Sequence, residues 1–137
     1  MNWATHAVVG SAIGKFVRHP VGGFAAGLAS HAALDVIPHY DYLTVEAGAI
    51  DLALGLAFLA ALGLRRSGEA GAWAILGATL PDLEVALSRF GVIAESDLLF
   101  PTHNGLLPHP HCARAVGLLV QACLTAVSLA LLVRGPA

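Results

Sequence analysis

A histidine and an aspartate four residues apart, His31 and Asp35, are the side chains of this sequence best suited to chemistry. On a helix, positions i and i+4 lie on one face, so this imidazole and carboxylate can bind the same metal ion. Pro38 then ends the helix, and His39 and Asp41 follow in the turn. Ligands that mix nitrogen with oxygen suit zinc, manganese or iron. The segment therefore predicts a divalent metal site, with zinc as the expected ion.

Further ionisable side chains fall at the same end of the predicted helices. His6 lies near the start of the first helix, Asp82 and Glu84 lie in the outer half of the helix predicted over 70–89, and His103 lies in the loop that follows. Together they offer more ligands than one ion needs, so we expect one to three ions. The expected metal ligands are His6, His31, Asp35, His39, Asp82 and His103.

Glu84 and Asp41 are the expected catalytic residues. Glu84 neighbours an expected ligand, where it serves either as a general base or as a hydrogen-bond partner behind that ligand. His109 and His111 lie in a proline-rich loop, where a solvated side chain is the alternative to a ligand. The sequence leaves open which of these two histidines join His103 in the site.

Two other ionisable residues have weaker claims. Asp51 is either a further ligand or the cap of the helix predicted over 47–64, because the first turn of a helix favours acids. His19 is the one histidine expected on the opposite side of the membrane, away from the site.

The elements that must position these residues are continuous apolar stretches without the period-two alternation of a β-barrel. They cover residues 4–17, 21–37, 47–64, 70–89 and 113–133. A spanning helix needs about 20 mostly apolar residues, with a range of about 17–25. The last four stretches meet this length, and the first is short or tilted. We therefore expect an all-α polytopic membrane bundle of about five helices, forming one transmembrane domain over residues 1–137.

Small residues and chain breakers indicate how these stretches pack. Gly10 and Gly14 fall on the first stretch, and Gly23 and Gly27 fall on the second. Small residues four apart let helix backbones approach closely, so we expect these glycines to serve packing. The sequence Arg66-Ser67-Gly68 is predicted to separate the third stretch from the fourth.

The composition also indicates a membrane protein. Charged residues make up 12% of the chain, about half the ~25% of soluble domains, and 57% of residues are hydrophobic. So few charges cannot cover the surface of a small soluble protein. A net charge of −2 without a basic stripe gives no electrostatic footprint for nucleic acid. Membrane lipid is the expected partner, and the sequence leaves the oligomeric state open.

The positive charges predict the orientation. No basic region precedes the first apolar stretch, so the start of the chain is not typical of a cleaved signal peptide. The positive-inside rule places the Lys- and Arg-rich loops in the cytoplasm. We therefore expect an integral protein of a prokaryotic plasma membrane, with its N-terminus outside and its C-terminus in the cytoplasm. Five of the seven Lys and Arg residues then share the cytoplasmic side, namely Lys15, Arg18, Arg65, Arg66 and Arg134.

Four motifs carry a resemblance to a known family. They are Thr5-His6-x-x-x-Gly10, Ser30-His31-x-x-x-Asp35 running into Pro38-His39-Tyr40-Asp41, Gly77-x-x-Leu80-Pro81-Asp82, and Thr102-His103. Together they resemble the YdjM-like membrane-bound, metal-dependent hydrolases of bacteria and archaea, a family distantly similar to zinc-dependent phospholipase C. The resemblance covers about residues 4–125. It implies an α-helical membrane protein with metal ligands at His6, His31, Asp35, Asp82 and His103.

Three functions follow from these observations. A carboxylate near the bilayer centre costs about 2.5–3.5 kcal/mol, so the buried acids require a metal, a proton or a water-filled cavity. The first function is a hydrolase that uses a metal-activated water on a phosphoester or ester bond of a lipid at the outer face. The second is an ion or proton conductor, because intramembrane acids and histidines also mark relays. The third is a structural protein in which the metal ties helices together.

Overall fold

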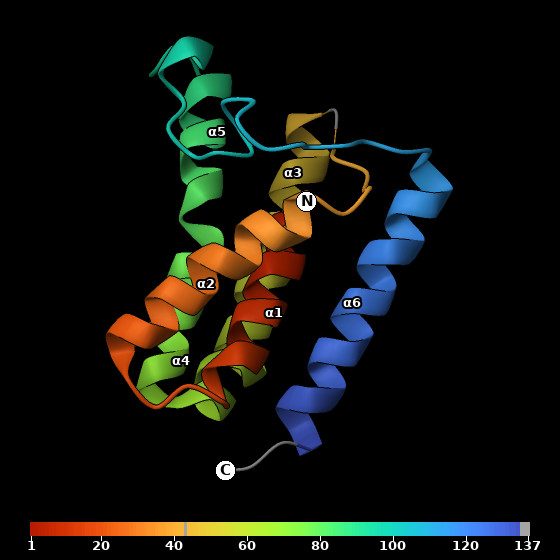
Figure 1. Cartoon of the computed structure of the whole chain (residues 1–137). Helices are drawn as coiled ribbons and strands as arrows, with labels where there is room; N and C mark the ends of the chain where they lie inside the picture. Colours follow the sequence, from red (N-terminus) through yellow and green to blue (C-terminus); the bar gives the residue numbers. More distant parts are fainter. Residues whose placement is uncertain (43, 135–137) are drawn as a thin grey trace.

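The computed structural model describes residues 1–42 and 44–134, and this part of the chain is helical and contains no strand (Figure 1). The prediction of an all-α fold is confirmed. The α-helices are α1 (Trp3–Gly14), α2 (Pro20–Asp35), α3 (Val45–Phe58), α4 (Leu64–Thr79), α5 (Pro81–Arg89) and α6 (Arg114–Arg134). A π-helical turn, η1 (Leu59–Gly63), joins α3 to α4, and a short 3-10 helix, η2 (Glu95–Asp97), follows α5.

The longest helical run extends from Val45 to Arg89 and turns back on itself near Gly68. Gly68 has φ 67° and ψ −170°, a conformation that glycine adopts without strain. In Figure 1 the chain descends through α3, turns at the lower end of the molecule and rises again through α4 and α5. The predicted break at Arg66-Ser67-Gly68 therefore lies where the chain reverses.

Two helical stretches of the described residues are long and apolar enough to cross a membrane. They are Val45–Arg89, which contains an 18-residue segment with a mean hydropathy of 2.0, and Arg114–Arg134, which contains one with 2.3. The helices α1 and α2 have 12 and 16 residues, short of the usual 17–25. The stretch predicted over 21–37 forms α2, which ends two residues earlier than predicted, at Asp35. Pro38 disfavours helical backbone in the residue before it, so the chain leaves the helix early.

Glycines let α4 pack closely against both α1 and α2. A Cβ added at Gly27 would overlap the carbonyl oxygen of Ala74, and one added at Gly23 would overlap that of Ala70. At Gly14 an added Cβ would overlap the backbone of α4. Hydrogen on the glycine Cα is the only substituent that these backbone contacts leave room for. The packing role predicted for the glycines of α1 and α2 is confirmed.

The side chain of Asp51, in α3, caps the N-terminus of α1. Its Oδ2 accepts the N–H of Ala4 at 3.0 Å, and the side chain is buried. The first N–H groups of a helix lack partners and carry partial positive charge, so a carboxylate there is stabilising. The helix α3 is itself capped by Thr44, whose Oγ1 accepts the N–H of Ala47 at 3.2 Å. The alternative in which Asp51 caps its own helix is therefore wrong.

Gln121 joins α6 to the upper end of the molecule, where the ionisable residues gather. Its Oε1 accepts the N–H of Asn2 at 2.9 Å, and its Nε2 donates to the carbonyl of Tyr40 at 2.8 Å. Gly117, one turn earlier on α6, lies so close to Tyr40 that a Cβ would overlap its backbone. These contacts fix α6 against the segment that follows α2.

Candidate metal centre

Five ionisable side chains meet in the interior at the upper end of the helices. They come from α1, α2, α5 and the loop between η2 and α6. Three of their side chains are fully buried and a fourth is 2% exposed, whereas that of Asp82 is 20% exposed. We call this set the deep group, and its members are His6, His31, Asp35, Asp82 and His103. It contains five of the six predicted metal ligands.

Asp35 is the centre of the deep group. Its Oδ1 lies 3.2 Å from Nε2 of His6. Its Oδ2 lies 3.1 Å from Nε2 of His31 and 3.4 Å from Nε2 of His103, and it accepts the hydroxyl of Thr102 at 2.8 Å. The four-residue spacing of His31 and Asp35 therefore brings both to one point, as the sequence predicts.

In the neutral rings of His31 and His103, hydrogen bonds at Nδ1 leave Nε2 without a proton. Nδ1 of His31 lies 2.7 Å from the carbonyl oxygen of Ala78, and Nδ1 of His103 lies 2.8 Å from Oε1 of Glu84. Both partners only accept, so each Nδ1 donates and the neutral ring keeps a lone pair on Nε2. The two Nε2 atoms lie 3.4 Å apart. Two lone pairs this close, beside the carboxylate of Asp35, require a proton or a metal ion to hold them together.

Other buried atoms of the deep group also lack hydrogen-bond partners among the residues that the structure describes. These are Nδ1 and Nε2 of His6, whose 3.2 Å contact with Asp35 lacks hydrogen-bond geometry, and Oδ2 of Asp82. An unpaired buried polar group costs about 1–3 kcal/mol. One ligand atom each of His6, His31 and Asp82 lie within 4.8 Å of one another. The same holds for His31, Asp35 and His103. Imidazole nitrogens with carboxylate oxygens suit a divalent transition metal or zinc, so the deep group fits such an ion.

Glu84 supports His103 from behind. Its Oε1 accepts the ring N–H of His103 at 2.8 Å and the N–H of Phe100 at 2.9 Å, and its Oε2 accepts the N–H of Leu99 at 2.8 Å. A carboxylate behind a ligating histidine orients the ring and raises its basicity. Since both oxygens of Glu84 are engaged, these contacts favour the supporting role over that of a general base.

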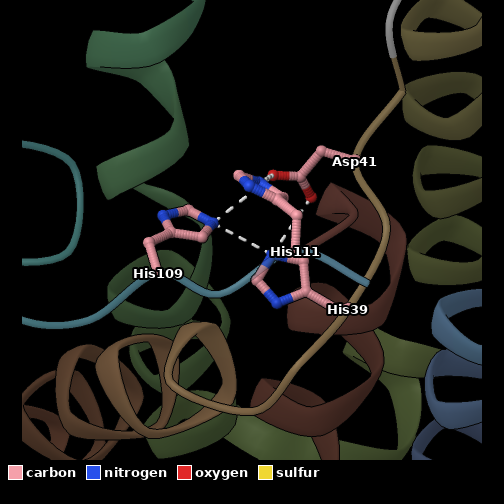
Figure 2. A group of neighbouring side chains, drawn as sticks. All are labelled: His39, Asp41, His109 and His111. Atoms are coloured by element: carbon pink, nitrogen blue, oxygen red, sulfur yellow. Dashed lines mark hydrogen bonds and ion pairs between the residues drawn. The ribbon is translucent and has the colours of Figure 1, made fainter. Parts of the chain in front are cut away.

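A second cluster lies where the segment after α2 meets the loop before α6. Figure 2 shows its four members, His39, Asp41, His109 and His111, which we call the upper group. Nε2 of His39 lies 2.9 Å from Nε2 of His109 and 3.2 Å from Oδ1 of Asp41. Oδ2 of Asp41 lies 3.3 Å from Nε2 of His109 and 3.0 Å from Nε2 of His111. The structure thus joins the two predicted residues with the two histidines that the sequence left open.

Neighbouring groups shift the pKa of two residues in the loops. Burial acts to raise the pKa of Asp41, but the nearby imidazoles of His109 and His39 and the amino group of Met1 hold it well below its usual range. Burial acts to lower the pKa of His103, but hydrogen bonds to Asp35 and Glu84 raise it above its usual value. Without a metal ion, the surroundings of His103 therefore favour its protonated form more than water does.

A pocket of about 430 Å³ lies beside both groups. Asp82 and His103 of the deep group and Asp41 and His109 of the upper group contribute to its wall. Arg89 also lines it, and its guanidinium donates to the carbonyl of Tyr42 at 3.4 Å. The volume falls in the range of small-molecule sites, about 300–1,000 Å³. Most of the remaining wall is apolar and comes from α3, from α5 and from the residue that follows α5, including Val45, Leu52, Leu83, Val85, Ala86 and Phe90.

No protein-family model, curated protein or solved structure matches this chain.

Sequence reasoning missed two partners of Asp35. One is the Thr102 hydroxyl, which donates to Oδ2 of Asp35; its position next to the expected ligand His103 was the available signal. The other is the amino group of Met1, which lies 2.7 Å from Oδ1 of Asp35 and 3.4 Å from Oδ1 of Asp41. This contact links the deep group to the upper group, and nothing in the spacing of the sequence signals it.

His19 lies at the other end of α2, away from both groups. Its Nδ1 accepts the N–H of Val21 at 3.3 Å and caps the helix. The structure thus places His19 outside the site, as the sequence predicts.

Proposed function

We propose that this chain is a membrane-embedded, metal-dependent hydrolase that acts on a phosphoester or ester bond of a lipid. The observation that carries the proposal is the pocket, whose wall combines residues of both groups with apolar side chains of α3 and α5. An apolar wall stabilises a hydrocarbon chain by removing it from water, and the polar residues lie where a bond to be cleaved would be held.

The membrane location is supported by the surface as well as by the two long apolar helical stretches. Large apolar side chains of α3 and α6 are exposed, among them Ile50, Leu54, Leu119 and Val127. Soluble monomers rarely expose contiguous apolar surface of this kind. We propose five passes, through α1, α2, α3 with η1, α4 with α5, and α6. In a prokaryotic plasma membrane this topology places the N-terminus and both groups at the outer face, and the C-terminus in the cytoplasm.

The deep group supplies the ligands for the proposed ion, with zinc as the first choice and manganese or iron as alternatives. These ligands include all five that the resemblance to the YdjM-like hydrolases implies. When bound, the ion would act as a Lewis acid and lower the pKa of a water molecule.

The protein's own groups would then orient the reactants. Glu84 holds the ring of His103 through Nδ1. Asp82 lines the pocket and has an oxygen without a hydrogen-bond partner among the described residues, so it would hold the ion on the side that faces the pocket. The catalytic role predicted for Asp41 stays a prediction. Arg89 on the same wall favours a substrate with an anionic headgroup.

The test is a metal count followed by a substrate screen on the full-length chain in mild detergent. Mass spectrometry with inductively coupled plasma counts the ions per chain, and mixed micelles present phospholipids and neutral glycerides. We expect at least one ion and release of product from one lipid class, both lost in His31→Ala. His19→Ala is the matched control, since His19 lies outside both groups, and it should keep both properties.

Two outcomes would contradict the proposal in different ways. A metal-loaded protein that leaves every lipid class intact would contradict the hydrolase and favour an ion that ties helices together. A folded protein that takes up no zinc, manganese or iron would contradict the metal itself. It would favour protonated carboxylates in an ion or proton relay, to be tested by flux into liposomes.

A further inference from the structure

We propose that the upper group is a metal site in its own right, which binds a zinc-type ion separately from the deep group. The two groups share no residue, so their ions would add in a metal count. The proposal concerns His39, Asp41, His109 and His111, and it does not depend on hydrolase activity.

Backbone pairing holds the two loops that carry the upper group. The N–H of His39 donates to the carbonyl of Pro110 at 3.2 Å, and the N–H of Cys112 donates to the carbonyl of His39 at 2.9 Å. This pairing forms an isolated parallel bridge between His39 and His111. The neighbouring Tyr40 is held by Gln121 of α6. These contacts hold together the two distant segments that carry the four side chains, independently of the contacts among the side chains themselves.

In the neutral rings of His39 and His109, the proton lies on Nδ1, so the two facing Nε2 atoms cannot form a hydrogen bond with each other. Nδ1 of His39 lies 2.7 Å from the carbonyl of Ile37, and Nδ1 of His109 lies 3.3 Å from the carbonyl of Thr102. A carbonyl only accepts, so both Nδ1 atoms donate and both Nε2 atoms carry lone pairs. The Nε2 atoms nevertheless lie 2.9 Å apart. This arrangement is repulsive unless a cation or an added proton lies between them.

The four side chains lie close enough together to share one ion. Zinc binds imidazole nitrogen and carboxylate oxygen at about 2.0–2.2 Å, which places neighbouring tetrahedral ligands about 3.3–3.6 Å apart. Nε2 of His39 lies 2.9 Å from Nε2 of His109, the histidine contacts with one or the other oxygen of Asp41 measure 3.0–3.3 Å, and one ligand atom from each of the four residues lies within 4.8 Å of the others. Figure 2 shows the three imidazole rings and the carboxylate converging on one point. Three nitrogens and one oxygen suit zinc far better than calcium or magnesium, which prefer oxygen.

Oδ1 of Asp41 gives an independent indication of a ligand. This atom is buried and has no hydrogen-bond partner among the described residues, although His39 and the Met1 amine lie within 3.4 Å of it. A carboxylate oxygen without a donor in a buried position is costly. An ion bound by the upper group would compensate that charge.

The two sites differ in their access to solvent. The side chain of His111 is 58% exposed and that of Asp41 is 28% exposed, whereas three members of the deep group have none of their side-chain surface exposed. The ion of the upper group should therefore exchange with solution and be removed by a chelator before the ion of the deep group. Since Asp41 and His109 also line the pocket, this ion would face whatever the pocket binds.

The experiment uses Co²⁺ as the probe, because tetrahedral cobalt sites absorb visible light strongly. The full chain, freed of metal by a chelator, is titrated with Co²⁺, and bound ions are counted. We expect the double variant His109→Ala/His111→Ala to bind one ion fewer than wild type and to lose part of the tetrahedral spectrum. The complementary variant, His31→Ala, should keep the spectrum of the upper group. The control His19→Ala should match wild type.

Equal ion counts in wild type and in the double variant would overturn the proposal. If the double variant does not fold, the single variant His111→Ala replaces it, because that side chain is mostly exposed. Loss of this ligand should lower the affinity for one Co²⁺ ion by at least about 10-fold. An unchanged titration of His111→Ala would overturn the proposal as well. None of these readouts uses turnover, so failure of the hydrolase proposal leaves the result interpretable.

Discussion

Replacing Glu84 by glutamine separates its two possible roles. The carboxylate accepts three hydrogen bonds, from the ring of His103 and from the N–H groups of Leu99 and Phe100. Glutamine offers one carbonyl oxygen in place of two carboxylate oxygens, and its NH2 group only donates. If the carbonyl keeps the two bonds of Oε1, the NH2 group faces the N–H of Leu99, donor against donor. The ring of His103 then loses its charged partner.

The size of the effect follows from these contacts. Mutation of a partner behind a metal ligand usually weakens metal binding about 10- to 100-fold. That range corresponds to about 1.4–2.7 kcal/mol, similar to the ~1.5–3 kcal/mol of one hydrogen bond to a charged group. We therefore expect Glu84→Gln to lower the affinity of the deep group for its ion by this factor. The affinity of the upper group for its ion should not change.

The assay is a competition for zinc between the purified chain and a chromophoric chelator of known affinity. Glu46→Gln is the matched control, because Glu46 is an exposed acid in the first turn of α3. Unchanged zinc affinity in Glu84→Gln would refute the supporting role. If turnover fell by 100-fold or more at the same time, Glu84 would be the general base that the sequence left open.

Three further predictions concern packing, metal removal and pH. Gly27→Val should destabilise the protein by about 1–3 kcal/mol or prevent folding, because the added Cβ would overlap the carbonyl oxygen of Ala74. At Gly48 an added Cβ would meet no atom of the described residues within 4 Å, so Gly48→Ala should be neutral or stabilising by about 0.5–1 kcal/mol. Thermal melts in detergent compare the two variants with wild type. If Gly27→Val melts at the same temperature as wild type, the close packing of α2 against α4 is refuted. Removing metal should lower the melting temperature by about 5–10 °C relative to zinc at 100 times its Kd, and an unchanged melt would mean that no ion stabilises the fold. In the metal-free chain the raised pKa of His103 contributes stability at pH below the ordinary 6.5, which is lost as pH rises through the folded pKa. Melts from about pH 5 to 8 should show this trend in wild type but not in His103→Gln, and zinc should reverse it because protons compete with the ion.

The sequence predicted the helical fold and the convergence of the deep group for a physical reason. Apolar stretches that alternate in direction bring every second connection to the same end. Residues such as His31, Asp35 and Asp82, which lie near those ends, therefore come close together. The i,i+4 spacing of His31 and Asp35 then sets their relative position within one helix turn.

The upper group was only partly predictable because its geometry is not set by helical periodicity. His39 and Asp41 follow a helix, so their location was constrained by Pro38. His109 and His111 reach them through main-chain pairing between segments 70 residues apart, and local sequence carries no signal of such pairing.

The role of Asp51 shows a second limit of the sequence. An acid near the start of a helix suggests a cap for that helix. In the structure Asp51 reaches the first turn of α1 instead, at Ala4. The choice between the two helix starts depends on how α1 and α3 are packed, which the composition of neither helix determines.

Backbone carbonyls orient the rings of His31, His39 and His109, and this has a consequence for how the sequence can diverge. Every residue carries a carbonyl, so the side chains at the accepting positions are free to change wherever space permits without turning the rings. His103 differs, because its acceptor is the side chain of Glu84. In diverged relatives, Glu84 and His103 should therefore be conserved or lost together. The residue at the position of Ile37 should vary even where His39 is conserved.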